Sequence, residues 1–389
     1  MSCSYDGDTT KELQHAGESA FVIEPSVPSN GNGNITSQAV PQPPPTPPEE
    51  YILNMLNYPL ALHETDEVYR ISKEDLDMFR RFQDRTVYTI GTKQTVPIYR
   101  EVITKLGCEH CYLTHVLFTI VLMHDRYLPG QQWRPPLHKE TFHHYHGTAI
   151  FNSMLSKSIP QEEKDAMWGA AALLGAITIA SIDGTTPEEC WPIAPASPSD
   201  LDWLRMSDGK KEVWRLADPM REDSIWRPAL THEHTPDMEA QTDRRADFET
   251  LLPCLTKLYN FDASADGSDD PYHTACSIIV RLLPMKCTHA NILWFLSFLG
   301  HMAPAYRQLL HKKDPKAILL LAWWYAEMLD YPAWWIQRRA MLECKAICVF
   351  LQQRFMPWSE IGKLLDFPKM MCGLAVSPEY ARRVEEVRS

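Results

Sequence analysis

Residues 314–355, DPKAILLLAWWYAEMLDYPAWWIQRRAMLECKAICVFLQQRF, predict two buried helices folded back on each other. Asp314 is a favourable N-cap, and Pro315 stands at the first helical position, where its missing N–H costs nothing. From Ile318 to Leu329 the first helix is apolar on nearly every side, with Glu327 the only charge in that stretch, and such a helix is buried. Pro332 ends it, and the short connection makes the two helices antiparallel neighbours.

The second helix of this hairpin begins at about Ala333 and has one apolar face. The residues on that face recur at spacings of three and four: Ile336, Ala340, Cys344, Ile347 and Leu351. Four tryptophans flank the turn: Trp323, Trp324, Trp334 and Trp335. The periodicity predicts a core hairpin. A sharper hypothesis makes the same hairpin one wall of an apolar ligand pocket.

The composition limits the classes of protein to which this chain can belong. The chain has 389 residues, of which 44% are hydrophobic, enough for a substantial core. A net charge of −12 argues against a broad nucleic-acid surface on this chain, but it leaves association with a DNA-binding partner open. The ten cysteines are scattered through apolar helices, a usage that suits a reducing compartment. The acidic, polar N-terminus is not a signal peptide.

The pattern along the chain predicts an all-α fold behind a tail. Residues 1–48 are rich in proline, asparagine and glycine and predict a disordered tail, so the helical domain covers residues 49–389. Tyr51–Leu62 predicts a short helix or turn, and Ser72 with Asp75 resembles a capping box. Further helices are predicted at Val96–Leu106, Cys111–Tyr127, Thr141–Leu155, Pro160–Ile182, Leu201–Trp214, Ala246–Tyr259, Pro271–Leu283 and Asn291–Leu310.

Loops are expected between these helices, and no segment alternates as a strand would. The predicted loops are Pro129–Pro136, Thr185–Ser199, Met220–Arg245 and Asp262–Asp270. Pro357 and Pro368 are expected to break the C-terminal stretch. The apolar runs Tyr112–Met123 and Ala166–Ile182 are interpreted as buried helices rather than membrane spans.

Two local patterns have spacings seen in metal sites. Cys108-x-x-Cys111 has half of a structural zinc motif but no second pair, so ordinary buried thiols are expected. Glu140-x-x-His143 has a di-iron spacing but occurs once, so a partly exposed histidine cluster is expected. The sequence therefore predicts no metal site and no cofactor.

Catalytic motifs are also lacking. Ser207-x-x-Lys210 has a β-lactamase-like spacing without its companion motifs, and we give it no catalytic role. An isoprenoid-type enzyme would need an acidic metal motif on a helix, whereas Asp269-Asp270 lies in a predicted loop without a third acid. We predict that the chain is not an enzyme, and an all-α isoprenoid-type enzyme is the third alternative.

Three stretches resemble the regulatory region of fungal-specific transcription factors of the zinc binuclear-cluster class. They are Leu76–Tyr127, with the helix pair around VPIYREVITKLGCEHCYLTHVLFTIVLMHDRYLP; Phe142–Ile182; and the hairpin of residues 314–355. The subgroup that this order of segments resembles most is that of the sterol-uptake-control regulators. The resemblance spans roughly residues 50–355.

This resemblance implies an all-α regulatory domain that acts in the nucleus, with shuttling from the cytoplasm left open. It also implies an apolar ligand, sterol-like or another lipid or secondary metabolite, and a homodimer or a heterodimer with a transcription factor. The family's DNA-binding unit needs six closely spaced cysteines, whereas residues 1–75 contain only Cys3. We therefore expect no zinc-cluster DNA binding by this chain.

The leading hypothesis is a fungal transcription regulator or co-regulator that senses an apolar small molecule and acts through protein partners. The ligand is expected between Asn291–Leu310 and the hairpin. The predicted pocket residues are Trp294, Phe298, Met302, Leu320, Trp323, Trp324, Met328, Trp334 and Trp335. The alternative is a constitutive helical interaction module without a ligand, in which these residues are core.

Overall fold

The predicted hairpin is present as α15 (Pro315–Met328) and α16 (Trp334–Gln352), which pack against each other. The Asp314 carboxylate caps α15 by accepting the backbone N–H of Ala317 at 2.9 Å. Every side chain of α15 from Ala317 to Met328 is buried, as expected for a helix that is apolar on all sides.

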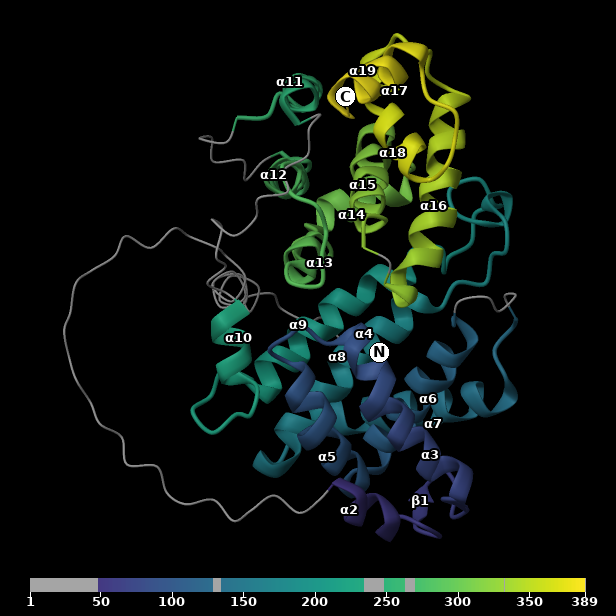
Figure 1. Ribbon diagram of the computed structural model, residues 1–389, viewed down its shortest axis with the longest axis vertical. Helices are drawn as coiled ribbons and strands as arrows, with labels where there is room; N and C mark the ends of the chain where they lie inside the picture. The colour runs from purple at the N-terminus through teal and green to yellow at the C-terminus, as the bar shows by residue number, and fades with distance from the viewer. Residues whose placement is uncertain (1–47, 129–133, 234–247, 263–269, 332, 389) are drawn as a thin grey trace, which may run out of the picture.

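The computed structural model describes residues 48–128, 134–233, 248–262, 270–331 and 333–388 (Figure 1). The predicted disordered tail of residues 1–48 lies outside the described residues, except for Pro48. Most of the predicted loops Pro129–Pro136 and Asp262–Asp270 lie outside them as well. The all-α fold class is confirmed for the described part of the chain.

The N-terminal half, residues 48–233, contains the helices drawn in purple to teal in Figure 1. Its α-helices are α2 (Pro48–Asn54), α3 (Lys73–Arg81), α4 (Val87–Ile90), α5 (Thr104–Glu109), α6 (Cys111–Arg126), α7 (His138–Leu155), α8 (Lys164–Ala180), α9 (Met206–Ala217) and α10 (Arg227–Glu233). Two short π-helices are η1 (Phe82–Thr86) and η2 (Ile98–Ile103). Three short 3-10 helices are η3 (Gln161–Glu163), η4 (Pro187–Glu189) and η5 (Asp202–Arg205).

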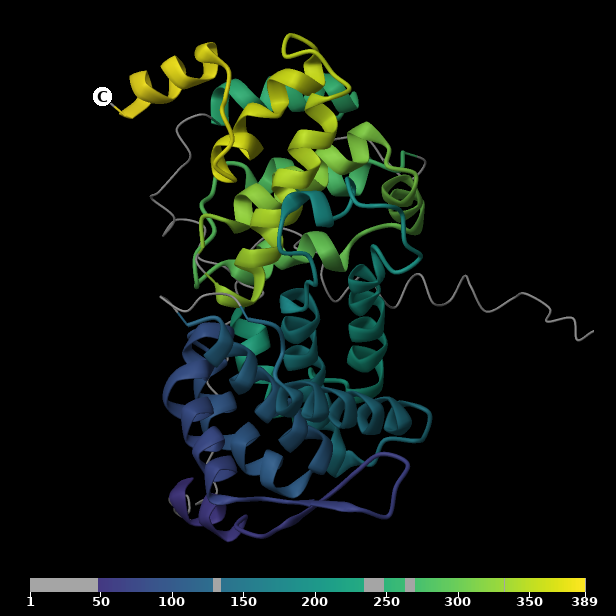
Figure 2. The ribbon, with the colours of Figure 1, turned by 90° about the vertical axis from the view of Figure 1, so that its right-hand side faces the viewer.

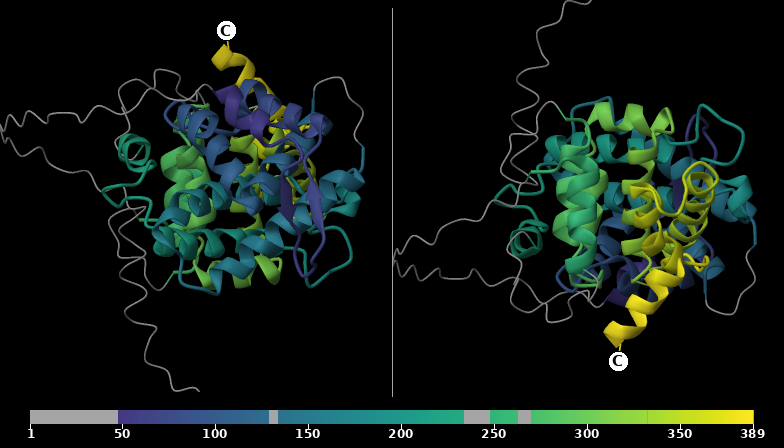
Figure 3. Two further views of the ribbon diagram at one scale, coloured as in Figure 1. Left: turned by 90° about the horizontal axis from the view of Figure 1, so that it is seen from below. Right: turned by 90° about the horizontal axis from the view of Figure 1, so that it is seen from above.

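The C-terminal half, residues 248–388, surrounds the hairpin. It adds α11 (Phe248–Tyr259), α12 (His273–Leu282), α13 (Ile292–Gly300), α14 (Pro304–His311), α17 (Glu360–Leu364), α18 (Asp366–Met371) and α19 (Pro378–Arg388). In Figure 2 the two halves are stacked along the long axis, and α19 projects from the top of the molecule. The views along that axis in Figure 3 show the same projection.

A small β-hairpin stands where the sequence predicted only a helix or turn. Strands β1 (Pro59–Ala61) and β2 (Val68–Arg70) pair antiparallel, with Leu60 opposite Tyr69. They form because α2 ends early: Asn57 has a φ of 64°, a left-handed conformation that no helix continues. Leu60 is fully buried, so the β-hairpin of β1 and β2 closes one end of the N-terminal half.

Three other element predictions were wrong in detail. Helix α10 lies inside the predicted loop Met220–Arg245. The predicted helix Asn291–Leu310 is two helices, because Pro304 begins α14 and cannot continue α13. Pro368 does not break the chain, since it lies in the first turn of α18, where no intrahelical N–H is needed.

The two halves share one continuous cluster of buried apolar side chains. Helix α16 packs on α8, and α13 packs on α9, so the hairpin reaches across the junction between the halves. The apolar runs considered as membrane spans lie in α6 and α8, and no helix among the described residues has the length and apolar character to cross a bilayer.

Candidate ligand cavity

A cavity of about 240 Å³ lies at the junction between the two halves. The N-terminal half contributes residues from the segment after α4, from η2 and from helices α8, α9 and α10, and the C-terminal half contributes α13 and the start of α16. The residues that line it include Tyr99, Trp168, Gly175, Lys210, Trp214, Trp226, Trp294 and Trp335. Residues from both halves are therefore needed to build its wall.

The floor of the cavity is a stripe of small residues on α8. Ala172, Gly175 and Ala176 face the cavity one helical turn apart, followed by Ile179. A methyl group built at Gly175 would meet only the sulfur of Met206, at 3.2 Å. The space therefore exists because α8 carries small side chains where a core helix usually carries large ones.

The walls are aromatic rings. Trp168 and Trp214 meet edge to face with centroids 5.0 Å apart, and Tyr99 and Trp226 do so at 5.1 Å. The Trp226 indole N–H donates to the backbone carbonyl of Asp165 at 3.0 Å. That polar atom is satisfied by the protein itself, so the Trp226 ring offers an apolar surface to whatever fills the cavity.

Polar groups gather on the α9 side of the cavity. Lys210 and Lys211 both line it, and the Lys210 ammonium lies 5.2 Å from the centre of the Trp168 ring. Ser207, one turn before them, is buried. Lys211 and Leu293 are exposed lining residues, so the cavity opens to solvent on this side. An apolar molecule with an anionic end would match this distribution of charge.

A second cavity of about 200 Å³ lies on the other side of Met206. It is lined mainly by α7, α8 and α9. Gly175, Met206 and Lys210 line both cavities, so the flexible Met206 side chain forms part of the partition between them.

Two of the nine predicted pocket residues, Trp294 and Trp335, line the first cavity. The other seven do not line it, and all of them are buried: Phe298, Met302, Leu320, Trp323, Trp324, Met328 and Trp334. Ligand binding by any of the nine stays a prediction; the cavity adjoins α13 and Trp335, and helices α8 and α9 form much of the rest of its lining.

The buried tryptophans of the hairpin are held by polar contacts within the core. The indole N–H of Trp323 donates to the Leu364 carbonyl at 2.9 Å, and that of Trp324 donates to the Phe295 carbonyl at 2.7 Å. Trp334 stacks on His124 with centroids 5.0 Å apart. These contacts fix the three rings in the core, and none of the three lines either the first or the second cavity.

Sequence reasoning missed the part of the wall that comes from α8 and α9. Trp168 precedes the run GAAALLGAITIA, which was interpreted only as a buried helix. Small residues recurring at helical spacing beside a tryptophan were the available signal. That signal is weak, because the same pattern also permits close helix packing.

The Glu140-x-x-His143 pattern has a structural role in the described part of the chain. Glu140 accepts two hydrogen bonds from the Arg126 guanidinium, at 2.7 and 3.1 Å. His143 is fully buried rather than partly exposed, and its Nδ1 lies 2.8 Å from Nδ1 of His115. Burial lowers the pKa of His143 to about 3, and the neighbouring His115 adds to the shift.

The other two patterns also have ordinary surroundings. Cys108 and Cys111 are half-buried thiols, and burial raises the pKa of Cys108 to about 12, so its thiol stays protonated. Ser207 and Lys210 both line the first cavity, a placement that the spacing alone did not predict.

No protein-family model matches the sequence, and a search of curated proteins finds no significant match. The resemblance to fungal transcription factors therefore stays a prediction, and the cavity has to be interpreted from its own geometry.

Proposed function

We propose that this chain is a ligand-responsive regulatory protein that binds a compact apolar acid in the cavity beside α8. The observation that carries the proposal is the composition of the wall, in which tryptophans from both halves surround one opening with two lysines. We further propose that the protein regulates transcription through protein partners in the nucleus. That part of the proposal rests on the sequence resemblance alone.

The volume limits the size of the ligand. Pockets for drug-sized molecules span roughly 300–1,000 Å³, and an apolar cavity of about 150 Å³ accepts benzene. A cavity of about 240 Å³ lies between these values and favours a one- or two-ring aromatic or a short branched chain over a complete sterol. The Lys210 and Lys211 ammonium groups favour a carboxylate at one end of the molecule.

The position of the cavity supports a regulatory role. Trp335 lines the cavity, and its indole N–H donates to the Thr89 carbonyl in α4 at 3.0 Å. Trp334 beside it donates to the Thr89 hydroxyl at 2.8 Å. A ligand that packs on Trp335 would favour one arrangement of the two halves over others, which is how binding biases a conformational equilibrium.

The test is thermal unfolding of the purified full chain with matched probes. Indole-3-acetate and its neutral amide share a compact aromatic body, and ergosterol represents a complete sterol. A ligand at 100 times its Kd stabilises a folded protein by about 2.7 kcal/mol. We expect the acid to raise Tm most. An unchanged Tm with all three probes would contradict the ligand proposal and favour the constitutive interaction module.

Gly175→Leu is expected to weaken binding of the acid by at least about tenfold, or about 1.4 kcal/mol. The new side chain would occupy the cavity, because a Cβ at Gly175 meets only the Met206 sulfur. Leucine is also a better helix former than glycine, so α8 should not be weakened. Isothermal titration calorimetry measures the change.

The matched control is Gly209→Leu, in the middle of α9. A Cβ at Gly209 meets nothing within 4 Å, and Gly209 lines the second cavity but not the first. It receives the same side chain without filling the proposed site. Equal affinity for the acid in Gly175→Leu and wild type would place the ligand elsewhere.

Lys210→Met is expected to weaken binding of the acid several-fold while leaving binding of the amide nearly unchanged. Methionine keeps most of the apolar stem of Lys210 and removes the charge that would meet a carboxylate. Calorimetry with both probes gives the ratio of the Kd of Lys210→Met to that of wild type, once for the acid and once for the amide. An equal loss for acid and amide would mean that Lys210 acts through packing and not through charge.

A further inference from the structure

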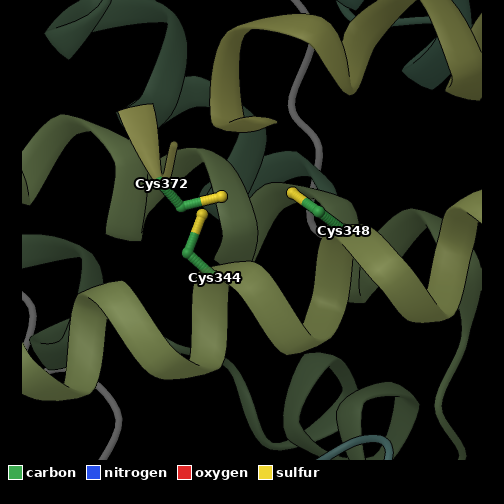
Figure 4. Close-up of side chains that lie close together, drawn as sticks. All are labelled: Cys344, Cys348 and Cys372. Atoms are coloured by element: carbon green, nitrogen blue, oxygen red, sulfur yellow. The ribbon is translucent and has the colours of Figure 1, made fainter. Parts of the chain in front are cut away.

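Three cysteine side chains meet in the core of the C-terminal half. Cys344 and Cys348 are one turn apart on α16, and Cys372 directly follows α18 (Figure 4). The three sulfur atoms all lie within 4.8 Å of one another. Cys344 and Cys348 are 0% exposed and Cys372 is 1% exposed, so the cluster is closed to solvent.

We propose that Cys344, Cys348 and Cys372 bind one Cu(I) ion through their three sulfur atoms. Thiolates are soft ligands that select Cu(I), zinc or iron–sulfur clusters among biological metals. Structural zinc takes four ligands, whereas among the described residues this cluster offers three sulfurs and no histidine or carboxylate. Three sulfurs with no fourth donor suit a monovalent soft ion better than a divalent one.

The present geometry is close to what such a site needs. For metal–sulfur bonds of about 2.3 Å, three sulfurs around one ion stand roughly 4 Å apart. The observed upper limit of 4.8 Å is therefore within reach of small side-chain rotations. Little would be lost on binding, because thiols are weak hydrogen-bond donors. Cys344 donates to the Ala322 and Pro368 carbonyls at 3.6 and 3.7 Å, and Cys372 donates to the Lys369 carbonyl at 3.5 Å.

The charge of the site has partners close by. Three thiolates and one Cu(I) carry a formal charge of −2, and each thiol that ionises releases a proton to solvent. Lys345 follows Cys344 on α16, and Lys369 lies on α18 one turn before Cys372, where it also pairs with Asp366 at 3.9 Å. Both lysines are therefore close in sequence to the cysteines whose negative charge they would offset.

A bound ion would join α18 to α16. The start of α18 is already tied to the segment before α19, because Asp366 accepts the backbone N–H of Ser377 at 2.9 Å and its hydroxyl at 2.6 Å. The ion would add a second attachment at the other end of α18. Loading with Cu(I) should therefore raise the Tm of the full chain as well as bind tightly.

The experiment titrates the reduced full chain with Cu(I) without oxygen, in competition with the chromophoric chelator bicinchoninate. We expect one Cu(I) per chain to resist the chelator. Loss of a group that merely orients a ligand costs roughly 10–100-fold in metal affinity, so Cys348→Ser and Cys372→Ser should each cost about a hundredfold or more. X-ray absorption at the copper edge should show three sulfur neighbours.

Cys276→Ser and Cys111→Ser are the matched controls and should keep wild-type affinity. Cys276 is a buried thiol outside the cluster, and Cys111 belongs to the half-buried Cys108 pair. Equal copper retention in wild type and Cys372→Ser would overturn the proposal, as would tighter binding of zinc than of Cu(I). If the cluster variants fail to fold, the sulfur count of the wild-type copper complex decides: three supports the site and two overturns it.

Discussion

Lowering the pH from 6.5 to 4.5 is expected to destabilise this protein by several kcal/mol, because the folded protein keeps His115, His124 and His143, among other histidines of the described residues, buried and neutral. Burial lowers the pKa of His115 to about 4, that of His143 to about 3 and that of His124 to about 4. Unfolded histidine has a pKa of about 6.5, so below pH 6.5 the unfolded chain binds more protons than the folded chain. Stability is therefore greatest above pH 6.5 and falls as the pH drops, by roughly 1.4 kcal/mol per pH unit for each histidine.

The His115–His143 contact explains why these rings resist protonation. Their Nδ1 atoms are 2.8 Å apart, so one nitrogen must donate and the other must accept. Protonating both rings would make both nitrogens donors and remove the hydrogen bond. Helices α6 and α7 cross closely here, since a Cβ at Gly147 would lie 3.1 Å from the Cβ of His115. Water therefore has little room to solvate the charge.

Urea unfolding at a series of pH values measures the slope of stability against pH. His124→Gln should reduce that slope by about one proton, or about 1.4 kcal/mol per pH unit, because glutamine does not titrate. The control is His138→Gln, which removes an exposed histidine at the start of α7. A stability that stays level from pH 6.5 to 5 would contradict the expectation.

The sequence was sufficient for the hairpin and insufficient for its surroundings. Asp314, Pro315 and the apolar run of α15 act locally, so their pattern fixed a buried helix with a defined start. The partners of α16 could not be inferred in the same way. Trp334 stacks on His124, a residue distant in sequence, and no local pattern reports such a contact.

The candidate site shows the same contrast between what a local sequence pattern predicts and what depends on residues distant in the sequence. A helix that is apolar on every side predicts burial but does not indicate which side adjoins empty space, so Trp323 and Trp324 appeared suitable as pocket residues. The cavity lies instead where α8 carries Gly175 and its small neighbours. A cavity depends on what several elements leave unfilled, and one sequence records only each element separately.

Arg339→Met is expected to destabilise the protein by roughly 3–5 kcal/mol, because it breaks a buried ion pair by removing one partner. Arg339 pairs with Glu343 one turn later on α16, and their side chains are 6% and 5% exposed. Tyr325 donates to the same carboxylate. Burial raises the pKa of Glu343, and the Arg339 charge opposes that rise, so the variant would leave a poorly solvated acid behind.

The guanidinium also closes the end of α8. Its Nε donates to the Ile179 carbonyl at 2.9 Å, and its Nη2 donates to the Ser181 carbonyl at 2.6 Å. These carbonyls lie at the C-terminal end of α8, where intrahelical donors run out, and a cation there also interacts well with the helix dipole. Arg339 thus joins the hairpin to the helix that forms the cavity floor.

Equilibrium unfolding of three variants separates the contribution of the Arg339–Glu343 ion pair from that of the hydrogen bonds to the α8 carbonyls. The double variant Arg339→Met/Glu343→Leu should be more stable than Arg339→Met alone, because it removes the unpaired buried charge, although the α8 carbonyls still lack their donor. The control Arg215→Met breaks the exposed pair with Glu212, whose side chains are 57% and 51% exposed, and should cost less than about 1 kcal/mol. If Arg339→Met costs no more than this control, the buried network of Arg339 and Glu343 does not hold α16 to α8.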